Sequence, residues 1–336
     1  MKLPDGKIPT DILREVVFKH LGAKRNEVVL GPSTGIDGAV VDVGNRSLIS
    51  SMDPITGALD RIGWLAVNIN ANDVATFGVE PAFFLSCIML PKNSDREMVE
   101  AISVQMGEAA KKLRVAIVGG HCEITQGLRN PIIVGCMMGE TEKGNYVTAA
   151  GAKPEDVLIL TKSTGIEGTA ILASDREDKL RKSMDQKMLR SAKRFYDQVS
   201  VVEEAITAFK TGGVDAMHDP TEGGVVGGIY EMADASKLGV RIVEGKITIR
   251  PETLEICKFF KINPLQLISS GALLIAVRPN AAGKVIENLH KKRIESSIIG
   301  NFVEDVKDRV LVRNDGAIQA LPKPASDQLW LALQRK

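Results

Sequence analysis

The chain has 336 residues, with 43 Lys and Arg against 42 Asp and Glu, so its charge gives no general reason to bind nucleic acid or an anionic membrane. The length suits two domains, and a hydrophobic content of 44% is enough for a core. The longest apolar stretch, around 82–90, is too short to span a bilayer, and the N-terminus lacks a secretory signal. We expect a cytoplasmic protein that binds neither nucleic acid nor membrane.

The first part of the chain alternates predicted helices and strands. Apolar residues at helical spacing predict a helix capped by Thr10 that runs to about Leu21, a second over 61–77 that ends at Gly78, and a third over 94–113 that opens with Ser94 and Glu97 as a capping box. Strands are predicted over 39–43, 47–50, 82–90, 115–118 and 131–138. The strand over 115–118 reads as buried and leads into the segment GGHCE.

Residues 142–154 are rich in Gly, Thr and Ala, so we place a domain boundary there, between domains 1–148 and 149–336. The second domain is predicted to contain strands over 157–160, 272–277, 297–300 and 310–312. Its predicted helices include one that ends at Lys210 and one over 281–290, while the charged region 174–194 reads as solvated helices. The fold class is therefore α+β with two domains.

Four segments place carboxylates in turns of small residues beside apolar elements. They contain Asp37, Asp53, Asp73 and Asp219. Asp beside Gly or Pro is most often a simple turn residue, so none of these segments is specific alone. Asp73 differs because it lies within a helical pattern next to Asn72, where a short polar side chain is unfavourable and a buried carboxylate needs compensation.

Several carboxylates together are typical of a Mg²⁺ site, because Mg²⁺ takes oxygen ligands and bridges nucleotide phosphates. Gly223 and Gly224 open a predicted helix and offer backbone N–H groups to a phosphate. The chain has neither the P-loop pattern nor a strand-borne Gly-x-Gly-x-x-Gly. A phosphate site here would belong to neither of those classes.

The same segments, in the same order, resemble the aminoimidazole-ribonucleotide-synthetase superfamily over nearly the full length. Residues 72–81 (NDVATFGVEP), 119–123 (GGHCE) and 219–224 (DPTEGG) carry the likeness, with Asp37 and Asp53 in the two early acidic turns. The superfamily includes selenophosphate synthetase, thiamin-monophosphate kinase and the hydrogenase-maturation protein HypE. The likeness to HypE proteins is strongest, through residues 85–87 (LSC) and 278–282 (RPNAA).

The resemblance implies a PurM-like fold. In it, two N-terminal sheets pair into a β-barrel in a homodimer, the C-terminal domain is an α/β sandwich, and Mg-ATP lies in a cleft between the halves. Carried over residue by residue, the implied metal ligands are Asp37, Asp53, Asp73 and Asp219. The resemblance implies that Gly120 and His121 line the nucleotide. Together with the residues singled out above, the candidate nucleotide-binding residues are Lys7, Asp37, Asp53, Asn72, Asp73, Gly119, Gly120, His121, Gly223 and Gly224.

His121 and Glu123 are the catalytic candidates, as a general base or phosphate donor and as an additional metal ligand. Each also has a structural interpretation, because a lone His beside a turn often only donates hydrogen bonds and an exposed Glu is often only solvated. The same holds for Lys7, which reads either as a phosphate contact or as an exposed charge.

The chain also departs from HypE proteins. Those proteins end in a cysteine that carries a carbamoyl group, whereas the last cysteine here is Cys257. They have Asn-Glu-Gly where residues 269–271 read SSG, and an early His-Gly-x-Gly-Gly loop where residues 5–9 read DGKIP. These departures from HypE proteins argue against synthesis of the hydrogenase cyanide ligand by this chain.

Two hypotheses follow from these residues and the resemblance. The first is a Mg-ATP-dependent enzyme, kinase-like or synthetase-like, that activates a small-molecule substrate by phosphoryl transfer. The second is a HypE-like protein that binds nucleotide without turnover and docks a maturation partner. The departures from HypE favour the second, and the retained aspartates favour the first.

Overall fold

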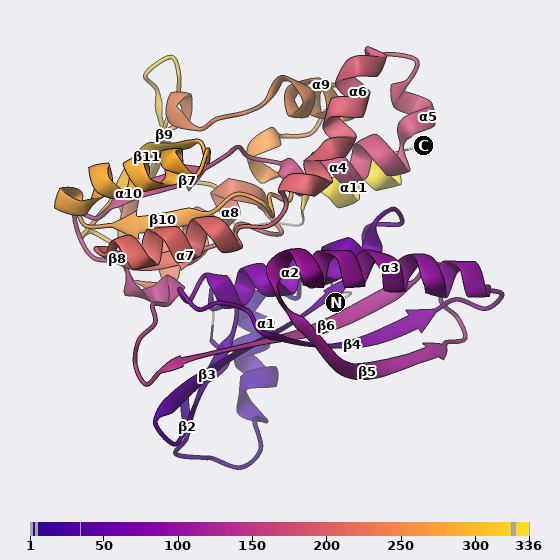
Figure 1. The fold of residues 1–336 in the computed structure, drawn as a ribbon. Helices are drawn as coiled ribbons and strands as arrows, with labels where there is room; N and C mark the ends of the chain where they lie inside the picture. The colour runs from indigo at the N-terminus through magenta and orange to yellow at the C-terminus, as the bar shows by residue number, and fades with distance from the viewer. Residues whose placement is uncertain (1–2, 4–5, 34, 324–326, 336) are drawn as a thin grey trace.

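The computed structural model describes residues 3, 6–33, 35–323 and 327–335. The N-terminal domain is a six-stranded sheet with helices on one face (Figure 1). Its strand order is β1-β2-β3-β6-β4-β5, in which β4 and β5 are parallel and the other neighbours antiparallel. The elements are α1 (Thr10–Glu15), β1 (Val28–Leu30), β2 (Ala39–Val43), β3 (Arg46–Ile55), α2 (Ile62–Ala75), β4 (Phe83–Leu90), α3 (Arg96–Leu113), β5 (Ala116–Ile124) and β6 (Ile132–Glu142).

The helix α2 lies between the N-terminal sheet and the second domain (Figure 1). All 14 of its residues are buried. A helix covered on every side carries apolar residues around its whole circumference, as this sequence does. Its polar side chains therefore have no access to water from the surface and must find partners inside the protein.

The C-terminal domain contains a seven-stranded sheet in the order β13-β12-β9-β11-β7-β10-β8. Only β12 and β9 are parallel among the described neighbours. Its elements are β7 (Val157–Thr161), α4 (Ile166–Asp175), α5 (Glu177–Leu180), α6 (Gln186–Lys193), α7 (Val202–Thr211), β8 (Val214–His218), α8 (Gly224–Ala235), β9 (Gly239–Val243), α9 (Pro251–Phe260), β10 (Leu274–Val277), α10 (Pro279–Lys291), β11 (Ser296–Val303), β12 (Arg309–Val312), β13 (Ile318–Ala320) and α11 (Gln328–Gln334).

These two sheets confirm the α+β class, and neither closes into a barrel within the described chain. No described helix is both long enough and apolar enough to cross a membrane. The predicted end of the third helix at Leu113 is confirmed, but its N-cap is Asp95, whose carboxylate accepts a hydrogen bond from Met98 N at 2.9 Å. The first helix is shorter than predicted: it ends at Glu15, because the residues that follow are largely exposed and have no core to pack against.

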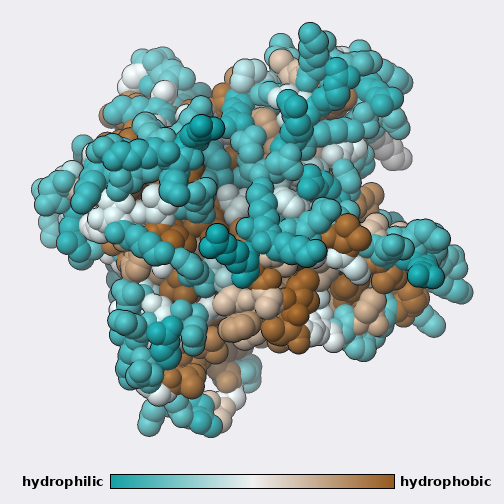
Figure 2. All heavy atoms as spheres, in the orientation of Figure 1, coloured by the Kyte–Doolittle hydropathy of each residue, from teal (hydrophilic) through white to brown (hydrophobic). Residues whose placement is uncertain are grey.

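The strand predicted over 115–118 is confirmed, but the prediction that it is buried is wrong for residues 116–118. The strand β5 continues to Ile124, includes the predicted glycine turn, and is exposed at every residue. It is the edge of the sheet, and the sheet face opposite the helices is open. Figure 2 shows that hydrophobic side chains gather on the N-terminal domain more than on the mostly hydrophilic C-terminal domain. Phe83, Ile117, Val118 and Ile124 contribute exposed apolar surface on β4 and β5.

Candidate functional site

A cavity of about 1210 Å³ lies between the two domains. The N-terminal domain lines it with β2, β3 and α2, and the C-terminal domain with α4, α11 and the residues before α8. Of the predicted site residues, Lys7, Asp37, Asp53 and Asp73 line this cavity. The fold therefore gathers residues that are far apart in the sequence into one cleft between domains.

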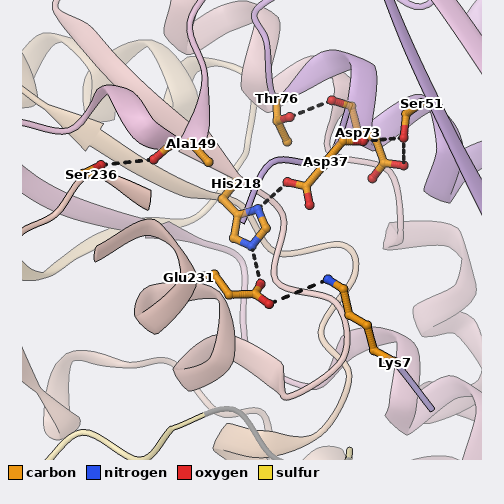
Figure 3. Close-up of polar contacts among 9 residues, drawn as sticks. All are labelled: Lys7, Asp37, Ser51, Asp73, Thr76, Ala149, His218, Glu231 and Ser236. Carbon is orange, nitrogen blue, oxygen red and sulfur yellow. Dashed lines mark hydrogen bonds and ion pairs between the residues drawn. The ribbon is translucent and has the colours of Figure 1, made fainter. Parts of the chain in front are cut away.

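Asp73 enters the cavity from the buried helix α2 and is 2% exposed. The hydroxyl of Ser51 on β3 donates to its Oδ2 at 2.8 Å (Figure 3). Burial, and after it the carboxylates of Asp53, Asp219 and Asp37, raises the pKa of Asp73 well above its usual range. A single hydroxyl does not compensate for an ionised carboxylate in this position, so the site needs a cation or a proton.

Asn70, one turn before Asp73 on α2, holds the neighbouring acidic turn in place. Its Oδ1 accepts from Asp53 N at 2.8 Å, and its Nδ2 donates to Asp53 O at 3.2 Å. The carboxylate of Asp53 remains directed to the cavity. Burial raises the pKa of Asp53 to about 6, although the charge of Lys7 opposes the shift. Asn70 thus holds the backbone of the Asp53 turn against α2.

Asn72 has a different position from the one expected for a nucleotide contact. Its Nδ2 donates to Val199 O and its Oδ1 accepts from Val201 N, each at 2.8 Å. Its side chain is fully buried and joins α2 to the C-terminal domain. Asn72 therefore fixes the two walls of the cavity relative to each other.

A chain of alternating charges crosses the cleft through His218, the last residue of β8. Its Nδ1 lies 2.5 Å from Asp37 Oδ2, and its Nε2 lies 3.0 Å from Glu231 Oε2 (Figure 3). Lys7 Nζ lies 3.7 Å from the other oxygen of Glu231. Burial disfavours a charged ring, but the two carboxylates raise the pKa of His218 well above its usual value. Both ring nitrogens of His218 thus face carboxylate oxygens, an arrangement that favours the protonated ring.

Glu231 and Lys7 complete this network. Burial raises the pKa of Glu231, but the hydrogen bond from His218 and the charge of Lys7 outweigh it and lower the pKa to about 2. Glu231 in turn raises the pKa of Lys7 above its ordinary value. The backbone N–H of Lys7 donates to Glu222 Oε2 at 2.9 Å. Sequence reasoning found Lys7 but missed His218 and Glu231, and the only local signal was the position of His218 beside Asp219.

Asp219 is the carboxylate of the cluster whose negative charge has the least compensation. It is 0% exposed, and neither of its carboxylate oxygens has a hydrogen-bond partner among the described residues. Burial, followed by the charge of Asp37, raises its pKa to about 8. Ligand atoms of Asp37 and Asp219 lie within 4.8 Å of each other and of a ring nitrogen of His218.

These residues fit Mg²⁺. Both nitrogens of His218 already face carboxylates, so the donors left for a metal are carboxylate oxygens, which Mg²⁺ prefers. Burial, and after it repulsion from neighbouring carboxylates, raises the pKa values of Asp53, Asp73 and Asp219, and a divalent cation would relieve that repulsion. The four aspartates predicted as metal ligands therefore lie in one electrostatically coupled group.

Gly223 and Gly224 open α8 as predicted, and both have positive φ. A Cβ on Gly224 would lie 2.6 Å from Leu265 O, so only glycine fits there. The N–H of Gly223 donates to Asp327 Oδ2 at 2.7 Å. Asp327 is the N-cap of α11, and its carboxylate occupies the place at the helix start where a phosphate oxygen was predicted.

The remaining predicted residues lie outside the cavity. His121 and Glu123 are on β5, with side chains 65% and 48% exposed, and form an ion pair of 3.2 Å. Gly119 and Gly120 precede them in the strand, and a Cβ on Gly120 would lie 2.0 Å from Ser86 O on β4. Within one chain, these glycines serve the close pairing of β4 and β5.

One carboxylate in the cavity was missed by sequence reasoning. Residues 269–271 lack the Glu that HypE proteins have, but Glu167 of α4 brings a carboxylate beside Ser270. Burial raises the pKa of Glu167 to about 7. No local pattern distinguishes this Glu from a first-turn acid that favours the helix N-terminus.

The sequence is similar to those of several named proteins. The chain matches a protein that is named for hydrogenase expression or formation in Methanocaldococcus jannaschii, with 26% identity over 315 residues and 91% of each chain covered. It matches the carbamoyl dehydratase HypE of Escherichia coli with 27% identity over 257 residues, 75% of this chain and 74% of the other.

Solved structures show the same fold. A HypE structure in a complex with HypF has a TM-score of 0.75 at 21% identity, covering 93% of this chain and 99% of that one. A HypE structure in complex with ATP has a TM-score of 0.73 at 20% identity, covering 97% and 98%. Residues 35–141 match the N-terminal domain of the AIR synthase related proteins, and residues 153–313 match their C-terminal domain. The chain belongs to the family of AIR synthase related proteins.

Proposed function

We propose that this protein is a HypE-like enzyme that binds Mg-ATP in the interdomain cavity and activates a small-molecule substrate by phosphoryl transfer. The observation that carries the proposal is the group of buried aspartates around Asp219, whose two oxygens have no partner among the described residues. A relative named carbamoyl dehydratase and a HypE structure with bound ATP support it.

Each residue of the cleft has a defined part in this proposal. Asp37, Asp53, Asp73 and Asp219 hold the metal, which supplies charge neutralisation to the phosphates when it is bound. Ser51 orients the carboxylate of Asp73, and Asn70 orients the turn that carries Asp53. Lys7 brings a positive charge to the cavity wall. The N–H of Gly223 would have to exchange Asp327 Oδ2 for a phosphate oxygen to take part in binding.

The chain has two features of a homodimer. The open face of the N-terminal sheet and the exposed edge strand β5 leave apolar side chains without cover in one chain. Pairing two such sheets into a barrel would bury them. The predicted catalytic part of His121 and Glu123 depends on this assembly, since it requires that β5 reach the cavity of the partner subunit.

The alternative is a nucleotide-binding maturation protein that docks a partner without turnover. The departures from HypE proteins, residues 269–271 among them, favour it, whereas the carboxylate of Asp327 at the start of α8 distinguishes neither hypothesis. The HypE structure solved with HypF supports the existence of a protein partner for this type of chain. Stoichiometric binding with no ADP release for any candidate substrate would favour this alternative.

Calorimetric titration with a non-hydrolysable ATP analogue, with and without Mg²⁺, tests the proposal. We expect Mg²⁺-dependent binding to the wild-type protein and none to Asp73→Asn, since that variant removes a charge from the metal-binding group. A folded wild-type protein that binds no nucleotide in either condition overturns the assignment. An assay of ADP release then separates the enzyme from the binding protein.

A further inference from the structure

A second cavity, of about 1050 Å³, lies between the two domains and shares no lining residue with the aspartate cavity. The N-terminal domain lines it with the end of α3 and the residues just before β4. The C-terminal domain lines it with the loop before α7, the first part of α7 and the residues that follow α10. Both domains therefore contribute a wall to this second cavity.

Most carboxylates in these walls are already neutralised. Five of them form ion pairs: Glu80 with Lys210, Glu140 with Arg46, Asp197 with Arg61, Glu203 with Lys292, and Glu204 with Lys162. Glu295 also lines the cavity and has no ion pair among the described residues. The walls thus offer one carboxylate whose charge has no partner.

The basic side chains are in excess. Those that line the cavity and have no carboxylate partner in the described part of the chain are Lys112, Arg114, Arg250 and Arg293. Four such cations against one carboxylate make the walls electropositive. A concave wall of one sign concentrates ions of the opposite sign.

Arg114 and Arg293 carry this charge into the cavity from opposite domains. Arg114 is the C-cap of α3, and Arg293 is the second residue after α10. Both have left-handed backbones, with φ of 58° and 61°, where glycine is the usual residue. Neither guanidinium has a hydrogen bond, an ion pair or an aromatic ring as a partner among the described residues. Each arginine therefore keeps all of its N–H donors available.

The other two cations are held by aromatic rings. The ammonium of Lys112 lies 5.3 Å from the ring centroid of Trp64, and the guanidinium of Arg250 lies 5.1 Å from that of Phe195. Arg250 also donates to the amide oxygen of Gln198 at 2.8 Å. These contacts orient the side chains but leave their positive charge uncompensated by any carboxylate.

The loop between these cations is fixed before any ligand arrives. Lys162, whose side chain is 12% exposed, donates to Gln198 O at 2.8 Å and Ser200 O at 2.7 Å, and lies 2.5 Å from Glu204 Oε1. Asn72 of α2 holds the carbonyl between them, at Val199. The ammonium of Lys162 is satisfied, so it shapes the wall rather than binding a ligand. A wall that is already organised lowers the cost of binding.

We propose that the second cavity binds a small polyanion, a molecule with two or more phosphate or carboxylate groups, between Arg114 of the N-terminal domain and Arg293 of the C-terminal domain. Arginine suits both kinds of group, because its planar fork of N–H donors matches two oxygens at once. Two anionic groups are required to engage both walls, and a cationic ligand is repelled. The site goes beyond the proposed function, since neither nucleotide nor Mg²⁺ takes part in it.

Calorimetric titration of the full chain in a chelator tests this site with three probes: pyrophosphate, tricarballylate and inorganic phosphate. We expect at least one polyanion to bind roughly tenfold more tightly than inorganic phosphate, because only a polyanion reaches the cations of both domains. Preference for pyrophosphate identifies a phosphate ligand, and preference for tricarballylate a carboxylate ligand. No binding of either polyanion, or binding no tighter than that of inorganic phosphate, overturns the proposal.

Variants assign the binding to the second cavity. Arg114→Gly and Arg293→Gly should each weaken the preferred polyanion by roughly tenfold, while glycine suits the left-handed backbone and preserves the fold. Arg293→Lys should retain more affinity than Arg293→Gly, because it keeps the charge. Thermal unfolding shows whether each variant is folded.

Lys237→Gly is the matched control. Lys237 has the same left-handed backbone, with φ of 56°, follows α8, and lines neither cavity. Its substitution removes one positive charge and should leave polyanion binding unchanged. A loss as large as that of Arg114→Gly and Arg293→Gly would show that the anion responds only to the total charge, and would overturn the site.

The same titrations separate this site from the nucleotide site. Asp219→Asn should bind the polyanion in the chelator as the wild type does. Wild-type protein that binds the polyanion through Arg114 and Arg293 but binds no nucleotide with Mg²⁺ would overturn the proposed function and leave the second site standing. Polyanion binding that both arginine variants retain in full would overturn the second site and leave the nucleotide site standing.

Discussion

The interdomain cavity and the edge strand β5 both present carboxylates near glycines, but their surroundings are opposite. Asp73 is 2% exposed, and burial raises its pKa. The side chain of Glu123 is 48% exposed, and hydrogen bonds from Thr125 and His121 lower its pKa. Asp73 in the cavity lacks compensating charge, whereas water and the neighbouring His121 already stabilise Glu123 on β5.

A carboxylate beside a turn is therefore not enough to identify a functional site. Buried carboxylates that lack compensating charge are the stronger sign. Asp219 and its neighbours repel one another in a place from which they cannot reach water. His121 and Glu123 form an exposed ion pair, the type of contact that contributes little by itself. Substitutions in the two regions should therefore have very different effects.

The largest effect is expected for Asp219→Asn. We expect its affinity for a non-hydrolysable ATP analogue with Mg²⁺ to fall more than roughly 100-fold, because substitution even of residues that merely orient metal ligands costs about 10- to 100-fold. Calorimetric titration measures the change. Retained affinity would show that the buried cluster does not hold the metal.

The next effect concerns stability. Asn72→Ala leaves Val199 O and Val201 N without their partner at the contact between the domains. Each buried group left unsatisfied costs roughly 1–3 kcal/mol, so the free energy of unfolding should fall by an amount in that range or above it. Denaturant unfolding measures it. Asn145→Ala, at an exposed asparagine, is the control and should be close to neutral; an equally small effect at Asn72 would contradict the interdomain role.

The metal-free protein should lose stability as the pH rises. The pKa of Asp219 is about 8 in the folded protein, against an ordinary value of 3.8, so the folded state holds this proton more tightly than the unfolded chain. Its contribution is complete below about pH 4 and is lost as the pH rises through about 8, on the order of a few kcal/mol. Thermal unfolding in a chelator between pH 4 and 9 should show a falling midpoint.

Two comparisons check the cause of this pH dependence. Asp219→Asn should flatten the curve, because the amide does not titrate in this range. Mg²⁺ should restore stability at the alkaline end, because it binds the ionised carboxylates of the folded protein. A midpoint that rises with pH in the chelator would contradict the raised pKa of the cluster.

The smallest effect is expected on β5. His121→Ala removes one exposed ion pair, and we expect less than about a threefold change in nucleotide affinity. The titration used for Asp219→Asn gives the direct comparison. A loss as large as that of Asp219→Asn would show that β5 reaches the cavity of a partner subunit, and sedimentation of the same samples would show whether the homodimer is present.

Local patterns in the sequence determined much of the fold and part of the site. Helical periodicity predicted α2 and the end of α3, and Gly78 marked the end of the second predicted helix, because those signals depend on residues a few positions apart. The poor helix propensity of Asp73 in an apolar helix marked it as needing compensation, and its burial beside three other aspartates agrees with that reasoning.

Only the tertiary structure decided the rest. Whether β5 is buried depends on its place at the edge of the sheet, and its apolar residues read the same in either position. His218 meets Asp37 across 181 positions of the chain, and Glu167 meets Ser270 across a domain. Such contacts depend on how whole elements pack, and burial then sets the pKa of each group. The sequence therefore determines which residues are suited to chemistry, and packing decides which of them are deprived of water and brought together.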